Sequence, residues 1–394
     1  MKKLYLLFLI ILLLSCAEKN AEEIYQGKLQ ELLLEDFSLE KDSLTRLFID
    51  LRVLTDSGKE YLVYPRSARS VKGTSFVFVN LQTSKEEHEI IIPSEGPDAM
   101  NGGGYYLPIS LNEALAINRL GWTATYNSKG VKVSELKTEL NLSNKMETLV
   151  MAETRRGMMY YEHPYIQIGQ NPSHLTNLSK STGSGEMRSS FPLDFKSWLT
   201  RINTETGEVQ YSDIGIPEGY EIFKSDMTAT HLIGAFDSKR GVFTLAWPYS
   251  EELSILDGLY LKKKIIAKSS VDFNFLPSEI IPWGDMWTAW ALPKEASANV
   301  FLLYDSYRDL YIRCSKIKES GTGETKFERT KHYVLSIYSG DWEPKGEYFF
   351  DFETELDVEN WFLTSEGLFI NKPEQESEDA YEFYKIDLSR VDDK

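Results

Sequence analysis

The sequence predicts an all-β protein, a six-bladed β-propeller built from four-stranded antiparallel blades, and three observations lead to this fold. First, aromatic residues make up 13% of the 394 residues, and aromatic side chains favour strands. Second, short apolar runs alternate with turns that combine Gly with Asp, Asn or Ser along most of the chain. Third, these hairpin units recur at intervals of roughly 55 to 60 residues, a spacing that suits four-stranded blades.

Strand-like runs follow one another from residue 73 onward. GTSFVFVNL at 73–81 and HEIIIP at 88–93 flank a polar stretch, which is the pattern of a hairpin. Further runs lie at 113–136, 198–217, 231–248, 299–317, 331–352, 361–373 and 380–388. From about residue 45 to the C-terminus the chain has room for six blades, and a closed ring protects the edges of so many strands. The alternative all-β arrangement is a pair of packed sandwiches.

The N-terminus predicts export and lipid anchoring. Lys2 and Lys3 precede an apolar run from Leu4 to Leu14, which is too short to span a bilayer but has the length of a signal-peptide core. The sequence LLSC that ends at Cys16 resembles a lipobox, so we expect a signal peptide at 1–15 and lipidation of Cys16. An ordinary secretory signal with an incidental cysteine is the alternative. Residues 16–27 are predicted to form a flexible tether, and 28–394 the propeller domain.

Charge and cysteine content restrict the function classes. The formal charge of −17 excludes nucleic acid and anionic lipid as expected partners, since both require a basic surface. We expect the protein to lie in the cell envelope and its folded domain to be monomeric. The acidic charge further predicts that only the lipid on Cys16 contacts the membrane. Ala17 after the cysteine favours the outer membrane, with the periplasmic and surface orientations both open. With Cys16 lipidated, Cys314 has no disulfide partner and is expected to be a buried thiol.

One long segment departs from the strand pattern. Residues 169–190 are polar and rich in Gly, Ser, Asn and Thr. A loop of this length in a compact domain is usually functional or disordered. We interpret it as a loop over one face of the propeller, with an inert insertion as the alternative.

The densest unusual cluster of side chains lies at 277–313 and is the predicted ligand site. Tryptophan faces beside a carboxylate are suited to a carbohydrate or peptide ligand. The candidate ligand-binding residues are Trp283, Asp285, Trp287, Trp290, Asp305 and Arg308. The alternative is that the tryptophans pack between blades while Asp285 and Asp305 cap turns. A further expectation is that Arg308 and Arg313 form an ion-pair lattice with Asp305 and Asp309 between neighbouring strands.

No enzyme motif is present, so no catalytic residue, metal site or cofactor is predicted. The histidines at 88, 163, 174, 231 and 332 are scattered singly, and none is placed near another His or Cys at metal-ligand spacing. The many acidic residues leave a carboxylate pair for glycoside hydrolysis open, but no pair stands out.

Three segments resemble a known family. They resemble parts of uncharacterised Bacteroidetes lipoproteins. The segments are the run at 58–100 with its III-P strand and Glu-Gly-Pro, the YNSKG turn at 126–130 and the closing WFLTSEGLFINK at 361–372. Those proteins are regarded as six-bladed propellers of the TolB-like type and form a domain of unknown function. The resemblance implies a propeller and a lipid anchor, and it implies no catalytic residues.

The function predicted from these features is a lipid-anchored binding or scaffold propeller whose partner is an envelope protein, a peptide or a glycan. A sensor for a membrane partner would share these features. The alternative is an exported hydrolase or lyase that cleaves polysaccharide or peptide. Converging carboxylates in a deep central pocket would favour the enzyme, and a channel filled by apolar side chains would favour the scaffold.

Overall fold

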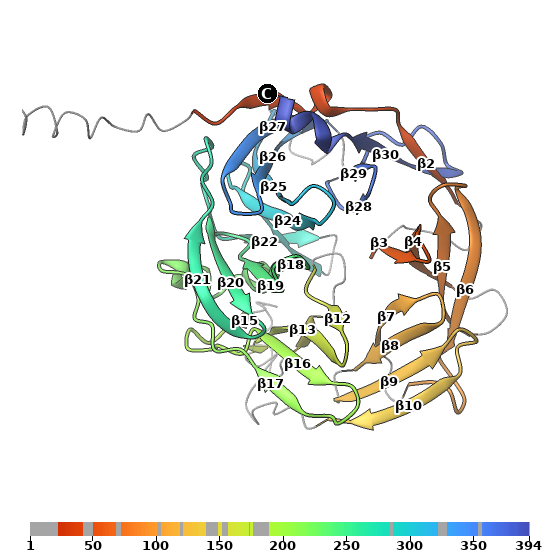
Figure 1. Cartoon of the computed structure of the whole chain (residues 1–394). Coiled ribbons are helices and arrows are strands. Elements are labelled where there is room, and N and C mark those ends of the chain that lie inside the picture. Colours follow the sequence, from red (N-terminus) through yellow and green to blue (C-terminus); the bar gives the residue numbers. More distant parts are fainter. Residues whose placement is uncertain are drawn as a thin grey trace, which may run out of the picture.

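The protein is a ring of six antiparallel sheets around a central axis, seen end-on in Figure 1. The ring confirms the propeller and rules out the paired sandwiches. The computed structural model describes residues 23–41, 50–67, 72–100, 104–118, 121–138, 149–151, 157–172, 174–175, 189–283, 287–321, 329–353 and 357–393. Cys16 and the predicted signal peptide lie outside these residues.

The first three blades follow the chain from the inside of the ring outward. Blade 1 consists of β3 (Arg52–Asp56), β4 (Lys59–Ser67), β5 (Gly73–Asn80) and β6 (Lys85–Pro93). Blade 2 consists of β7 (Tyr105–Ser110), β8 (Glu113–Ile117), β9 (Trp122–Asn127) and β10 (Lys132–Lys137). Blade 3 consists of β12 (Tyr160–Glu162), β13 (Tyr165–Asn171), β16 (Leu199–Asn203) and β17 (Val209–Tyr211), with β11 (Leu149–Met151) also paired to β13.

The last three blades include two strands from the N-terminus. Blade 4 consists of β18 (Ile233–Asp237), β19 (Val242–Ala246), β20 (Glu252–Asp257) and β21 (Tyr260–Ile266). Blade 5 consists of β24 (Ala298–Asp305), β25 (Leu310–Ser320), β26 (Thr330–Ser339) and β27 (Pro344–Phe352), with β1 (Gln26–Lys28) outside β27. Blade 6 consists of β28 (Trp361–Thr364), β29 (Gly367–Asn371), β30 (Ala380–Ile386) and β2 (Phe37–Glu40).

The N-terminal segment closes the ring. Strand β2 forms the outer edge of blade 6 by pairing antiparallel with β30, so that strands from opposite ends of the chain share one sheet. Strand β1 pairs in parallel with β27. Gln26 and Gly27, the last residues of the predicted tether, therefore belong to blade 5. Short 3-10 helices flank these strands, namely η1 (Leu29–Leu32) and η6 (Leu388–Asp393).

Apolar side chains fill every interface between neighbouring blades. Within the part of the chain that the structure describes, the buried residues form six clusters, and each cluster joins two adjacent sheets. Between blades 3 and 4, for example, the rings of Trp198 and Trp247 pack edge to face with 4.9 Å between their centroids, and both side chains are buried. Cys314 is fully buried, as predicted, and burial raises the pKa of its thiol. Its side chain lies in the cluster between blades 5 and 6. Interfaces of this kind stabilise the ring without a disulfide.

Local turn chemistry explains why the predicted hairpins form. In the YNSKG segment, Asn127 Oδ1 accepts hydrogen bonds from the backbone N–H groups of Lys129 and Val131. Gly130 has φ = 70°, and a Cβ there would lie 1.6 Å from the carbonyl oxygen of Ile91. Glycine is required here because it tolerates the positive φ and has no Cβ to clash with Ile91. Its small size lets this turn pack closely against the neighbouring blade.

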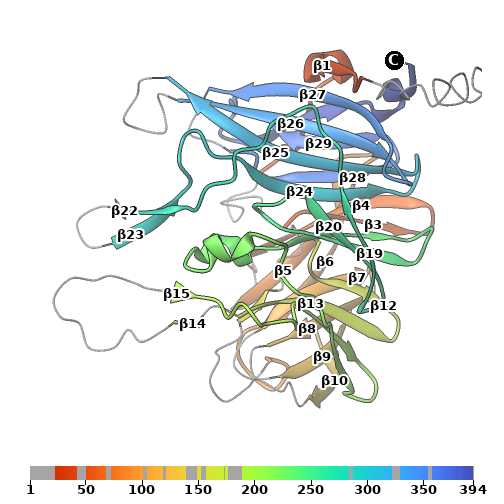
Figure 2. The ribbon, with the colours of Figure 1, turned by 90° about the vertical axis from the view of Figure 1, so that its left-hand side faces the viewer.

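The ring has two faces that are distinguished by topology. We call the side where each inner strand begins the entry face, and the opposite side, which carries the turns after the inner strands, the turn face. The inner strands are β3, β7, β12, β18, β24 and β28. Two small hairpins, β14 (His174–Leu175) with β15 (Ser189–Ser190) and β22 (Glu279–Trp283) with β23 (Trp287–Ala291), project from the entry face in Figure 2.

The long polar segment is only partly described. Residues 169–171 belong to β13, and 174–175 pair with 189–190. The stretch 176–188 lies outside the described residues. No helix in the described part of the chain is long and apolar enough to cross a membrane.

Candidate ligand site

The predicted tryptophan cluster lies on the β22–β23 hairpin. Trp283 and Trp287 are cross-strand partners in this hairpin, but their side chains are not described, and Asp285 lies outside the described residues. Trp290 is half-buried in β23. Two isoleucines of β22 are exposed, Ile280 by 44% and Ile281 by 38%. The hairpin therefore presents apolar side chains on the entry face.

A buried carboxylate attaches this hairpin to the ring. Asp226 is 2% exposed and precedes the 3-10 helix η4 (Met227–Thr230). Its Oδ2 accepts a 2.6 Å hydrogen bond from the backbone N–H of Ser278, immediately before β22, and its Oδ1 accepts one from the N–H of Thr228. The hydroxyls of Ser278 and Tyr249 are 3.0 Å apart, which links the base of the hairpin to blade 4.

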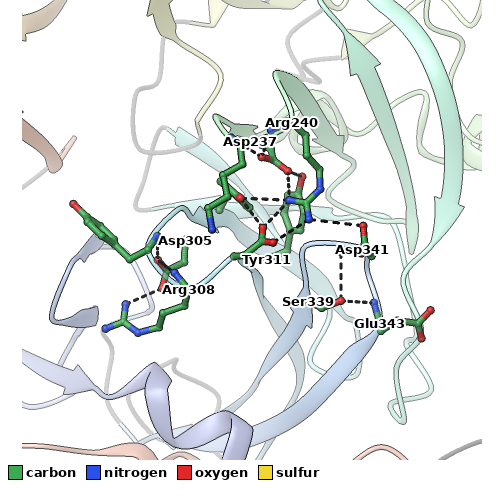
Figure 3. Close-up of polar contacts among 12 residues, drawn as sticks. Asp237, Arg240, Asp305, Arg308, Tyr311, Ser339, Asp341 and Glu343 are labelled. Carbon is green, nitrogen blue, oxygen red and sulfur yellow. Dashed lines mark hydrogen bonds and ion pairs between the residues drawn. The ribbon is translucent and has the colours of Figure 1, made fainter.

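Asp305 and Arg308 lie on the turn face, so the structure does not bring them together with the hairpin. Asp305 is fully buried, and its Oδ1 accepts hydrogen bonds from the backbone N–H groups of Tyr307 and Arg308. Its Oδ2 pairs with Arg308 Nη1 at 2.9 Å (Figure 3). Asp305 therefore caps a turn, as the alternative interpretation expected.

The same D-S-x-R turn occurs in blade 4, where it forms an ion-pair network with blade 5. The carboxylate of Asp237, fully buried, pairs with Arg240 Nη1 at 3.0 Å and accepts a hydrogen bond from the hydroxyl of Tyr311. Arg240 also donates two hydrogen bonds to Asp309 in blade 5. Arg313 takes no part in this network, because its guanidinium packs against the Phe273 and Tyr338 rings.

Hydrogen bonds between blades also join three turns of the turn face. Tyr307 in blade 5 donates to Glu60 in blade 1 at 2.7 Å. The backbone N–H and the hydroxyl of Ser365 in blade 6 donate to the same carboxylate. Arg308 donates to the carbonyl oxygen of Ser365 at 2.7 Å. These charged groups already have protein partners, so they stabilise the ring and leave little capacity for a ligand.

A pocket of about 160 Å³ lies between blades 1 and 2, where their inner strands begin at the entry face. Its walls are mostly apolar and aromatic, and they include two prolines and the edge of the glycine run. The lining residues are Asp50, Arg52, Val63, Pro65, Thr74, Phe76, Gly104, Tyr105, Tyr106 and Pro108. The pocket thus combines flat apolar surfaces with a guanidinium group, a composition typical of small-ligand sites.

Arg52 is the cationic group of this pocket. Its Nε and Nη1 atoms are buried, and neither has a hydrogen-bond partner among the described residues. Burial lowers the pKa of the guanidinium to about 10, and the nearby charge of Asp50 opposes this shift. The side chain therefore stays protonated at neutral pH. Buried donors without partners carry a free-energy cost of about 1–3 kcal/mol each, which a ligand carboxylate would relieve.

The backbone beside this arginine adopts an uncommon conformation. Asp50 has φ = 52°, in the left-handed region that Asp tolerates better than most residues. Such backbone outliers occur often at ligand sites. Sequence reasoning did not select Arg52, because in LRVLTDSGK it is one polar residue of a short strand. Only the placement of blade 2 against β3 shows that it is enclosed. Within the described ranges, no three His, Cys, Asp or Glu side chains are grouped to hold a metal ion.

Comparison with known proteins supports the fold. The chain is similar to a crystal structure of a DUF4221 family member from Bacteroides vulgatus, with a TM-score of 0.65 and 15% sequence identity over 90% of this chain and 96% of that one. It also matches the WD40 domain of Toxoplasma gondii coronin with a TM-score of 0.43 and 9% identity, over 92% of this chain and 89% of that domain. No family model and no curated protein matches the sequence. At this identity the first likeness shows the propeller fold, in agreement with the resemblance to a Bacteroidetes family of unknown function.

Proposed function

We propose that the protein is a lipid-anchored binding propeller of the cell envelope whose partner, a peptide, protein or glycan, presents a carboxylate to Arg52. The observation that carries this proposal is the pair of unpartnered guanidinium donors in the pocket between blades 1 and 2. A propeller scaffold and the similarity to a family of unknown function are compatible with a role in binding.

The pocket limits what can enter it. An apolar cavity of about 150 Å³ accommodates a benzene ring, so this pocket suits one small side chain or ring of a larger partner. Because the protein as a whole carries a formal charge of −17, an anionic partner is repelled except where a local cation offsets that charge. Arg52 therefore provides specificity for one carboxylate at one position.

Replacement of Arg52 by glutamine is expected to weaken carboxylate binding roughly 10- to 100-fold, the effect of one lost charge-assisted hydrogen bond or two. The probe is benzoate, titrated by NMR against the full mature domain, with benzamide as the neutral comparison. The matched control is Arg201→Gln, because Arg201 lies over the Tyr165 ring and pairs with Glu162, away from the pocket. Equal affinity of the parent protein and Arg52→Gln for benzoate would overturn the proposal, as would equal affinity for benzamide.

The anchor requires a separate test. Replacement of Cys16 by serine removes the thiol that accepts the lipid, so the protein is expected to move from the membrane fraction to the soluble envelope fraction. Incorporation of labelled fatty acid should be lost in parallel. Cys314→Ala is the matched control, because that buried thiol is expected to have no part in lipidation. Unchanged labelling in the Cys16 variant would refute the anchor.

A further inference from the structure

Blade 5 aligns a serine, a histidine and an aspartate at the end of three neighbouring strands. His332 of β26 is the register partner of Lys318 in β25 on one side and of Asp351 in β27 on the other. Ser320 follows Lys318 by two residues in β25, so its side chain shares that face of the sheet. The three side chains therefore come together through strand register, although they are separated in the sequence.

The hydrogen bonds among them have the order found in a nucleophile, a base and an orienting acid. His332 Nδ1 is 2.5 Å from Asp351 Oδ1, and His332 Nε2 is 2.8 Å from Ser320 Oγ. An ionised carboxylate only accepts, so Nδ1 carries the proton that it donates to Asp351. In the neutral ring, Nε2 is then the acceptor, and the hydroxyl of Ser320 donates to it. This arrangement is the one that activates a serine hydroxyl.

These side chains border an open groove on the sheet surface. The groove has a volume of about 660 Å³, and its lining includes Tyr333 and Phe349 as well as Lys318. The side chain of His332 is 21% exposed and that of Asp351 55% exposed, so a small substrate can reach the histidine. The site lies on blade 5 and shares no residue with the Arg52 pocket.

We propose that Ser320 is an activated nucleophile and that this groove catalyses acyl transfer from small esters. Ser320 Oγ attacks the ester carbonyl carbon while His332 Nε2 takes the hydroxyl proton. The bond from the carbonyl carbon to the alcohol oxygen then breaks, the alcohol leaves with that proton, and an acyl ester remains on Ser320. Water repeats the sequence with His332 as base and releases the carboxylic acid. Lys318 lines the groove and supplies positive charge for the oxyanion.

A fluorophosphonate probe tests the nucleophile directly, because a serine hydroxyl activated by histidine displaces its fluoride and an ordinary serine does not. The full mature domain is treated with the probe, and the labelled residue is identified by mass spectrometry. We expect labelling at Ser320 and hydrolysis of p-nitrophenyl acetate, with both lost in Ser320→Ala. His332→Gln should lower the labelling rate at least 100-fold, a modest value for removal of a catalytic base. Ser389→Ala is the matched control, because the Ser389 hydroxyl donates to Asp387 and has no histidine partner.

Asp351 is a positioning residue and needs its own readout. In Asp351→Asn, the ¹⁵N shifts of His332 should show a changed tautomer, and labelling of Ser320 should fall with it. Circular dichroism and the unfolding midpoint of each variant separate these effects from loss of fold. Labelling that is absent in the folded parent protein, spread evenly over exposed serines, or unchanged in His332→Gln would overturn the proposal.

Discussion

Simultaneous replacement of Phe37 and Leu39 by alanine is expected to lower the free energy of unfolding by about 5 kcal/mol, a large part of the stability of an ordinary domain. Leu39 is 2% exposed and lies in the cluster between blades 6 and 1. The Phe37 ring contacts those of Phe369 and Phe383 at 5.2 and 6.2 Å between centroids. Both side chains belong to the strand that closes the ring, so their loss weakens one blade and one interface together.

Chemical denaturation followed by tryptophan fluorescence measures this effect. The matched control is Ser38→Ala with Glu40→Gln, since these residues alternate with Phe37 and Leu39 on β2 and are exposed. The control should keep the stability of the parent protein. Because β30 would become an unprotected edge when β2 detaches, the double-alanine variant should also form dimers on size-exclusion chromatography. A midpoint that is unchanged in the double-alanine variant would show that the ring does not depend on this strand.

Replacement of Arg240 by methionine is expected to cost about 3 kcal/mol of unfolding free energy, because it leaves the buried carboxylate of Asp237 without its ionic partner. The remaining hydrogen bonds to Asp237, from the Tyr311 hydroxyl and from backbone N–H groups, keep the cost below that of a fully isolated charge. Asp341→Ala is the matched control: this carboxylate is 87% exposed and 3.7 Å from Arg240, so its removal should leave stability unchanged.

The effect of Arg240→Met should also depend on pH. Hydrogen bonds from Arg240 and from Tyr304 lower the pKa of Asp309 from 3.8 to about 2. A group whose pKa is lower in the folded state stabilises the protein above its unfolded pKa, and this contribution disappears as the pH falls through the folded value. Its size is about 1 kcal/mol, because the Asp309 side chain is 36% exposed and solvent screens the pair. The difference in unfolding free energy between the parent protein and Arg240→Met should therefore become smaller as the pH falls from about 4 to about 2. Denaturation curves of both proteins at each pH measure this difference, and a difference that stays constant would contradict the assignment.

Much of the fold could be predicted because its signals are local. Short continuous runs of β-branched and aromatic residues specified strands such as β5 and β29, and the turn from Asn127 to Gly130 after β9 could be identified from its residues alone. The burial of the Cys314 side chain could be predicted from the strand in which it lies. Such features depend on a few neighbouring residues, so one sequence is sufficient to reveal them.

The candidate sites depend on contacts between distant residues and could not be predicted in the same way. Asp305 and the tryptophan hairpin are close in sequence, yet they lie on opposite faces because β24 carries the chain from the entry face to the turn face. His332 appeared as an isolated histidine until strand register placed Asp351 beside it. A shift of one residue in β27 would direct that carboxylate to the other side of the sheet.

The sequence by itself predicted many of the strands, their turns and the blade repeat, and it favoured a ring over paired sandwiches, because apolar runs and turn chemistry act over a few residues. Only the tertiary structure decided that residues 37–40 close the ring, that Arg52 is enclosed between two blades, and that Ser320 meets His332. Each of these depends on the pairing register or packing of segments far apart in the chain, and local preferences do not encode that geometry.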